Sequence, residues 1–121
     1  MTEKIRTYRD LDIWKRGIEV GKDTYRLTNE FPKHELYGLT SQMRRSAVSI
    51  PSNVAEGFRG RHNKEYARFL DIALGSCAEL ETQATIAREL NYIALHDESQ
   101  MLEKLDHECR MIANLMKKLE S

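Results

Sequence analysis

Apolar residues recur at steps of three and four along most of the chain, and this spacing predicts helices. Over residues 35–58 the stripe consists of Leu36, Leu39, Met43, Ala47, Ile50, Val54 and Phe58. Over residues 63–90 a stricter heptad repeat consists of Tyr66, Leu70, Ala73, Cys77, Leu80, Ala84 and Ala87, which Phe69, Ile72, Ile86 and Leu90 broaden. Runs that alternate apolar and polar residues are absent from the sequence. The pattern therefore predicts an all-α protein.

Two further segments, residues 12–29 and residue 97 onward, have the same helical spacing. The first carries two apolar lines, one of Leu11, Trp14, Ile18 and Tyr25 and the other of Ile13, Gly17, Val20, Thr24 and Leu27. The last carries Leu102, Leu105, Cys109, Ile112, Met116 and Leu119. Asp10 or Asp12 can cap the first helix and Asp97 the last, and Asn91 suits a left-handed residue after the third. Four helices with short connections predict an antiparallel up-down four-helix bundle over residues 11–121, preceded by an N-terminal tail over residues 1–10.

Pro51 lies inside the second apolar stripe. Proline lacks a backbone N–H and its ring clashes with the carbonyl four residues earlier, here that of Ala47. We therefore expect the second helix to be kinked or broken near Pro51.

Composition places the chain among soluble cytoplasmic proteins. The 121 residues include 19 Lys and Arg, 19 Asp and Glu and two Cys, and no apolar stretch is long enough to span a membrane. The cysteines lack metal-binding spacing and the N-terminus lacks the apolar core of a signal peptide, so we expect a reducing cytoplasm and no membrane partner. The neutral total hides a split: residues 1–61 carry 12 basic and 8 acidic side chains, and residues 62–121 carry 7 and 11.

Enzymatic chemistry finds little support in the sequence. No Glu is followed three residues later by His, as a di-iron bundle requires, and no phosphate-binding glycine motif is present. Cys77 and Cys109 lie on helix seams, where free cysteine is usually a small buried hydrophobe. We predict no catalytic residues, no metal and no cofactor.

The second helix and the loop after it carry the unusual residues. A nucleic-acid interpretation takes the cations as a phosphate-facing set made of Arg44, Arg45, Arg59, Arg61, Lys64 and Arg68. A packing interpretation takes the small and polar residues as a motif face for close helix or subunit contact, made of Ser49, Pro51, Asn53, Glu56 and Gly57. The two interpretations are compatible, and the residues alone leave both open.

Five sequence segments also resemble a known family. They are Leu11-Asp-Ile-Trp, Phe31-Pro, Glu35-Leu-Tyr-Gly-Leu-Thr-Ser-Gln-Met-Arg-Arg-Ser, Ser49-Ile-Pro-Ser-Asn-Val-Ala-Glu-Gly and Ser76-Cys-Ala-Glu-Leu-Glu-Thr-Gln. The chain is similar, over about residues 8–119, to the bacterial four-helix bundle proteins first named from intervening sequences in large-subunit ribosomal RNA genes. A more distant resemblance links it to the accessory variability proteins of diversity-generating retroelements.

This resemblance implies a ring-like homopentamer without enzymatic activity. The distant relatives bind nucleic acid and a reverse transcriptase, so RNA or DNA and a reverse-transcriptase-like protein are the implied partners. Our hypothesis is a non-enzymatic, homo-oligomeric bundle that binds structured RNA or DNA as an accessory or ribonucleoprotein component. The alternative is a protein-interaction scaffold whose second-helix face serves subunit packing.

Overall fold

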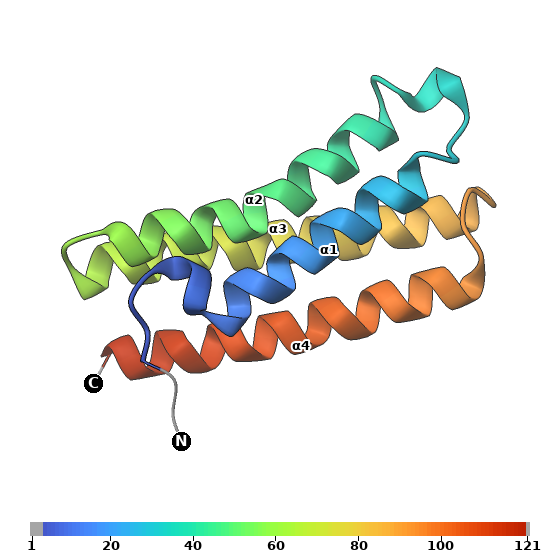
Figure 1. Ribbon diagram of the computed structural model, residues 1–121. Helices are drawn as coiled ribbons and strands as arrows, with labels where there is room; N and C mark the ends of the chain where they lie inside the picture. The colour runs from blue at the N-terminus through green and yellow to red at the C-terminus, as the bar shows by residue number, and fades with distance from the viewer. Residues whose placement is uncertain (1–3, 121) are drawn as a thin grey trace.

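The computed structural model describes residues 4–120, which form four α-helices and two 3-10 turns and contain no strand. The elements run in the order η1 (Tyr8–Asp10), α1 (Asp12–Thr28), η2 (Lys33–Glu35), α2 (Leu39–Arg59), α3 (Asn63–Glu89) and α4 (Leu95–Glu120). Figure 1 shows the four helices lying alongside one another, with the α2–α3 connection at one end and the α3–α4 connection at the other. The protein is therefore all-α, as the sequence predicts.

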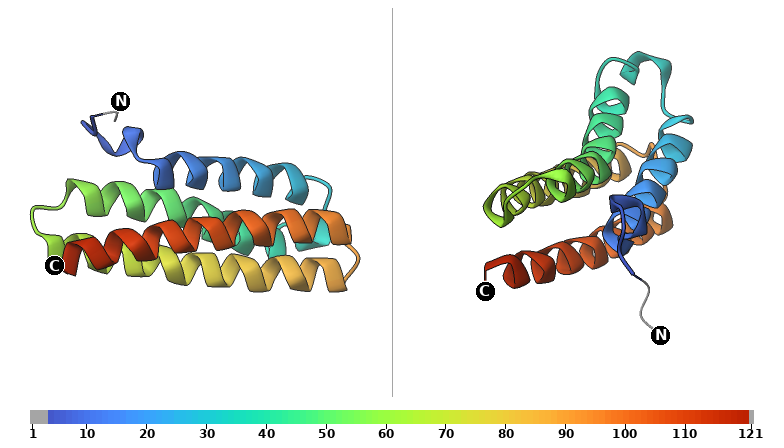
Figure 2. Two further views of the ribbon diagram at one scale, coloured as in Figure 1. Left: turned by 90° about the horizontal axis from the view of Figure 1, so that it is seen from below. Right: turned by 60° about the vertical axis from the view of Figure 1, so that its left-hand side comes forward.

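The contacts between helices are those of a bundle. Over the described residues α2 contacts α1 and α3, α4 also contacts α1 and α3, and no contact joins α2 to α4. The views in Figure 2 agree with this order, since α2 and α4 are separated by their two neighbours. The space between the four helices holds the core.

The predicted stripes of α2 and α3 supply most of that core. Met43, Ala47, Ile50 and Val54 of α2 are completely buried. The heptad seam of α3 is completely buried from its second member onward, at Leu70, Ala73, Cys77, Leu80, Ala84 and Ala87. Burial of this apolar surface is the main driving force for folding, and the 3.6-residue period revealed where it lies.

Apolar residues outside the central stripes are more exposed than the pattern predicts. On α1 the line through Ile13, Gly17 and Val20 is buried, whereas Ile18 and Tyr25 of the other line are exposed. On α3 the residues expected to broaden the seam, Ile72, Ile86 and Leu90, are also exposed. A helix packed against neighbours on one side buries a limited arc of its surface. On α1 and α3, one line of apolar residues is therefore buried and the other faces solvent.

The second helix starts later than predicted and continues through its proline. Residues 33–35 form a separate 3-10 turn, and α2 begins at Leu39, where the Glu35 carboxylate accepts a hydrogen bond from the Leu39 N–H at 3.1 Å. The same carboxylate accepts a bond from the Tyr92 hydroxyl at 2.8 Å. These two hydrogen bonds lower the pKa of Glu35. Of the kink or break expected near Pro51, the break does not occur, because α2 is one helix from Leu39 to Arg59.

Proline is tolerated at position 51 partly because α1 makes room for it. Pro51 is buried, and a Cβ atom placed on Gly17 would lie 3.1 Å from the Pro51 Cβ. Gly17 thus permits a close approach of α1 to the proline ring, and a larger residue would push the two helices apart.

The starts of α1 and α4 differ in detail from the prediction. Leu11, without a side-chain cap, precedes α1 in place of an aspartate, and α4 begins at Leu95, before the predicted Asp97. Asn91 has a φ of 64°, which confirms the left-handed residue after α3. Over residues 4–120 no helix is long and apolar enough to cross a membrane.

Candidate nucleic-acid interface

The six predicted cations do not form one patch. Arg44 and Arg45 lie in the second turn of α2, whereas Arg59 ends that helix and Arg61, Lys64 and Arg68 follow it. Fourteen residues of helix separate Arg45 from Arg59, or about 21 Å along its axis. The structure therefore divides the set into two arginines near the start of α2 and four cations around the α2–α3 connection.

An aromatic residue from the N-terminal segment joins the second group. The Arg59 guanidinium lies 5.4 Å from the ring centroid of Tyr8 in η1, and the Arg9 guanidinium also lies 5.4 Å from that centroid. Arg9 lies 5.1 Å from the Trp14 ring as well. Guanidinium groups held near aromatic rings in this way keep their charge at the surface in a defined position.

We call Arg9, Arg59, Arg61, Lys64 and Arg68 the basic end of the bundle. All five side chains are exposed, and Arg68 lies 4.8 Å from the Phe69 ring centroid. Within residues 4–120, none of the five forms an ion pair. Four of the five lie within residues 56–68, where the acidic residues are Glu56 and Glu65, so this stretch keeps a positive balance, whereas Arg9 is followed by Asp10. Sequence reasoning missed Arg9 because residues 1–10 read as a tail, although the adjacent Tyr8-Arg9 pair was a signal.

The two arginines near the start of α2 differ from each other. Arg44 is tied to the bundle, since its Nε donates to the Thr28 hydroxyl at 2.9 Å and its guanidinium lies 4.6 Å from the Tyr25 ring centroid. Arg45 is exposed and has no hydrogen bond or ion pair among the described residues. Arg44 therefore has a structural role within the chain, and Arg45 is available to a partner.

Two polar members of the motif face hydrogen-bond within the chain. The Ser49 hydroxyl accepts bonds from the Ser76 hydroxyl of α3 at 2.8 Å and from the Asn53 amide at 2.9 Å. The Asn53 amide also donates to the Ser49 carbonyl at 2.8 Å. The bond from Ser76 links α3 to α2, and the two bonds from Asn53 hold the Ser49 side chain within α2.

The remaining motif residues divide between packing and solvent. A Cβ atom on Gly57 would lie 2.8 Å from Cδ1 and 3.2 Å from the carbonyl oxygen of Tyr66, so this glycine permits close contact between α2 and α3. Pro51 packs against Gly17 as described above, whereas Glu56 is exposed. Contacts inside one chain thus explain Pro51 and Gly57, and Glu56 has no role within the described residues.

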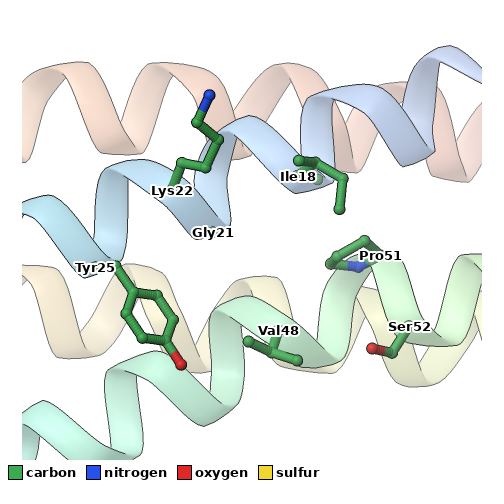
Figure 3. Close-up of a pocket in the computed structure, with 8 residues that line it drawn as sticks. Ile18, Gly21, Lys22, Tyr25, Val48, Pro51 and Ser52 are labelled. Carbon is green, nitrogen blue, oxygen red and sulfur yellow. The ribbon is translucent and has the colours of Figure 1, made fainter.

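A shallow apolar groove lies on the other side of α2, against α1. Its volume is about 550 Å³, and Figure 3 shows Ile18 and Tyr25 of α1 facing Val48 and Pro51 of α2 across it. Ile18, Tyr25 and Val48 are 37%, 48% and 46% exposed. A Cβ atom on Gly21, which lines the groove, would have no neighbour within 4 Å. The groove therefore has apolar surface that the residues of the structure between 4 and 120 leave uncovered.

The interior between α3 and α4 holds a polar group that the sequence analysis missed. Glu108 is completely buried, and neither of its carboxyl oxygens has a hydrogen-bond partner among residues 4–120. Burial raises the pKa of Glu108 to about 8, and the charge of Arg16 offsets a part of this effect. The sequence contained a signal for it, because Glu108 shares a helical spacing of three and four residues with Met101, Leu105 and Ile112.

The two thiols lie beside this carboxyl group. A hydrogen bond with Cys109 and burial together raise the pKa of Cys77, and the Cys109 thiol donates to Glu81 Oε1 at 3.9 Å. No three His, Cys, Asp or Glu residues between residues 4 and 120 are grouped so that they could hold a metal ion. Both cysteines are free thiols.

Comparison with known proteins matches this chain to one family and one fold. The model of the 23S rRNA-intervening sequence protein family matches residues 9–114. A crystal structure from Bacteroides thetaiotaomicron, described as a protein of unknown function from the S23 ribosomal protein family, is similar with a TM-score of 0.81 and 17% identity. That match covers 87% of this chain and 98% of the other. No curated protein matches the chain.

Proposed function

We propose that this chain, which belongs to the 23S rRNA-intervening sequence protein family, is a non-enzymatic, homo-oligomeric bundle that binds structured RNA or DNA, with RNA favoured by the family's name. In this proposal the helices are up-down and antiparallel, α2 is kinked at Pro51, and the protein acts as an accessory or ribonucleoprotein component in the cytoplasm of a bacterium. The proposal includes a reverse-transcriptase-like protein as a further partner.

The basic end carries the proposal. Five exposed cations there have no carboxylate partner among the described residues, and two of them flank the Tyr8 ring. Arginine suits phosphate because its planar fork donates two parallel hydrogen bonds. Unpaired cations avoid the competition of an internal carboxylate, and a nucleic acid would bind by displacing counterions.

The test is binding of labelled ribosomal RNA fragments, measured by filter retention at 50 mM and at 200 mM salt. Arg59→Glu with Arg61→Glu should weaken binding at least tenfold at 50 mM salt, because two phosphate contacts become repulsive. The slope of log affinity against log salt concentration should also become shallower, by about the amount expected for the loss of two phosphate contacts.

A matched control carries the same change of charge elsewhere. Lys33→Glu with Arg110→Glu alters two exposed cations outside the basic end and should leave affinity within about threefold. Equal losses in the two double variants would show that only net charge matters, and absence of binding by the wild type at 50 mM salt would exclude the proposal.

A second function, the protein-interaction scaffold, is favoured by the apolar groove between α1 and α2. In this alternative the groove is covered by another copy of the chain, and a pentamer is the assembly we propose. Val48→Asp should then lower the mass measured by light scattering, whereas Leu95→Asp, at an apolar position 66% exposed on α4, should leave the mass unchanged. An unaltered mass for Val48→Asp would remove the groove from the oligomer interface.

A further inference from the structure

A second groove, between α2 and α3, combines charged and uncharged polar groups. Its volume is about 470 Å³. Arg45, Ser46 and Ser49 line it from α2, and Ser76, Glu79 and Gln83 line it from α3. The three residues of α3 are spaced by three and four positions, and Ser49 lies three and four positions after Ser46 and Arg45, so each set lies on one face of its helix.

Gln83 is the feature that points to a binding site in this groove. The residue is 8% exposed, and no described residue hydrogen-bonds to its buried Oε1 atom. Buried carbonyl oxygens in proteins are almost always hydrogen-bonded, because burial removes the water that would otherwise satisfy them. An unpaired acceptor at the wall of a groove is therefore suited to an N–H or O–H donor from another molecule.

Two oppositely charged side chains line the same groove as this acceptor, and they do not form an ion pair with each other. Arg45 of α2 and Glu79 of α3 are both exposed and both line the groove. Neither has an ion pair or hydrogen bond within residues 4–120. The groove thus offers a donor fork on one wall and acceptors on the other.

We infer that this groove binds an unpaired guanine base of the RNA, an inference that rests on the proposed function. Guanine carries two adjacent acceptors, O6 and N7, which suit the Arg45 guanidinium. It also carries two adjacent donors, N1–H and the N2 amine, which suit the Glu79 carboxylate. The second hydrogen of the amine, or a ribose hydroxyl, is then the donor for Gln83.

The other bases lack this combination of groups. Adenine has an amine but no oxygen at position 6 and no N1–H, so both charged residues lose a partner. Cytosine and uracil have no N7 acceptor. Ile72, which also lines the groove and is 43% exposed, supplies an apolar surface for the face of a base. RNA-binding proteins commonly read unpaired bases in this way, through hydrogen bonds to the exposed edges.

The test uses RNA stem–loops that differ in one loop base, with affinity measured by fluorescence anisotropy at 50 mM salt. Replacement of a single loop guanine by adenine should weaken binding by the wild type at least tenfold. Inosine, which keeps O6, N7 and N1–H but lacks the amine, should weaken it by about threefold. In Glu79→Gln the guanine preference should fall below threefold, while affinity for the adenine loop stays within twofold of the wild type.

Controls separate loss of recognition from loss of folding. Glu79 is exposed, so its substitution leaves the core intact, and Asp71→Asn removes one exposed carboxylate from the same helix outside the groove. Asp71→Asn should keep the full guanine preference. Gln83→Leu should also reduce the preference, because it removes the buried acceptor.

The outcomes distinguish this inference from the proposed function. Equal binding of guanine and adenine loops by the wild type would overturn the guanine site and leave RNA binding in place. Failure of every stem–loop to bind would overturn the proposed function. In that event, guanosine monophosphate either shifts the NMR signal of the Gln83 side-chain amide, which supports the groove, or leaves it unmoved, which overturns the groove.

Discussion

Ser76 and Cys77 are neighbours in the sequence of α3 and both are buried, yet they take part in two different kinds of polar cluster. Ser76 donates a hydrogen bond to Ser49 of α2, next to Asn53. We call these three residues the amide–hydroxyl cluster. Cys77 instead meets Cys109 of α4, beside Glu108. We call Cys77, Cys109 and Glu108 the thiol–carboxyl cluster. One cluster is satisfied by hydrogen bonds, whereas the other contains a carboxyl group without a partner.

The difference shows what each side of α3 can do. Neutral groups that bond to one another tolerate burial at little cost, and on the α2 side they lie next to a groove open to a ligand. A carboxyl group sealed in the core is stable only in its protonated form, since an isolated buried charge is strongly disfavoured. The α2 side of α3 is therefore suited to recognition, and the α4 side couples the fold to pH.

The largest effect expected from this comparison is at Glu108. Its pKa of about 8 in the fold lies above the unfolded value of 4.5, so the folded state holds the proton more tightly. The contribution of Glu108 to the free energy of unfolding is then complete below about pH 4.5. It is lost as the pH rises through 8, by about 3–5 kcal/mol in total. Glu108→Gln should flatten this dependence and make the protein more stable than the wild type at pH 9, as measured by urea unfolding at several pH values.

The control for this prediction is Glu103→Gln, an exposed carboxylate on the same helix. It should keep the wild-type decline between pH 5 and pH 9. If Glu108→Gln shows the same decline as the wild type, the carboxyl group is ionised in the fold and the contrast between the two clusters disappears.

Much of the fold was predictable because apolar periodicity reports burial directly. The stripe of α2 and the seam of α3 were identified from spacing alone, and Asn91 was correctly expected to be left-handed. Pro51 was misread as a point where α2 could break, because the sequence does not show that Gly17 of α1 lies opposite the proline ring. A local sequence pattern carries no information about contacts between distant segments.

The candidate site was predictable in composition but not in grouping. Arg59 and Arg61 lie together at the basic end, whereas Arg44 hydrogen-bonds to Thr28 and lies over the Tyr25 ring, far from them along α2. Gln83 was overlooked because a glutamine on a helix is usually solvated, and only tertiary packing buries its oxygen. Spacing identifies the face on which a residue lies and leaves its partner undetermined.

A smaller effect is expected where α2 and α3 approach each other. Gly57→Ala places a methyl group 2.8 Å from the Tyr66 ring and 3.2 Å from its carbonyl oxygen, and should destabilise the protein by about 1–3 kcal/mol. Gly75→Ala, on α3, meets no neighbour within 4 Å and should stabilise it by about 0.5–1 kcal/mol through helix propensity. Thermal unfolding of both variants checks the contrast. Destabilisation by both alanines would mean that Gly75 is also covered, for example by another copy of the chain.

The smallest effect concerns the hydrogen bond between the two serines of the amide–hydroxyl cluster. In a double-mutant cycle, Ser49→Ala and Ser76→Ala should be coupled by about 0.5–1.5 kcal/mol, because each removes the partner of the other. Ser52→Ala, an exposed serine on α2, should be additive with Ser76→Ala. The cycle is measured by chemical unfolding at pH 6, where Glu108 remains largely protonated. Coupling near zero would mean that water satisfies the two hydroxyls equally well, and the cluster would then be an open part of the groove and not a fixed link between α2 and α3.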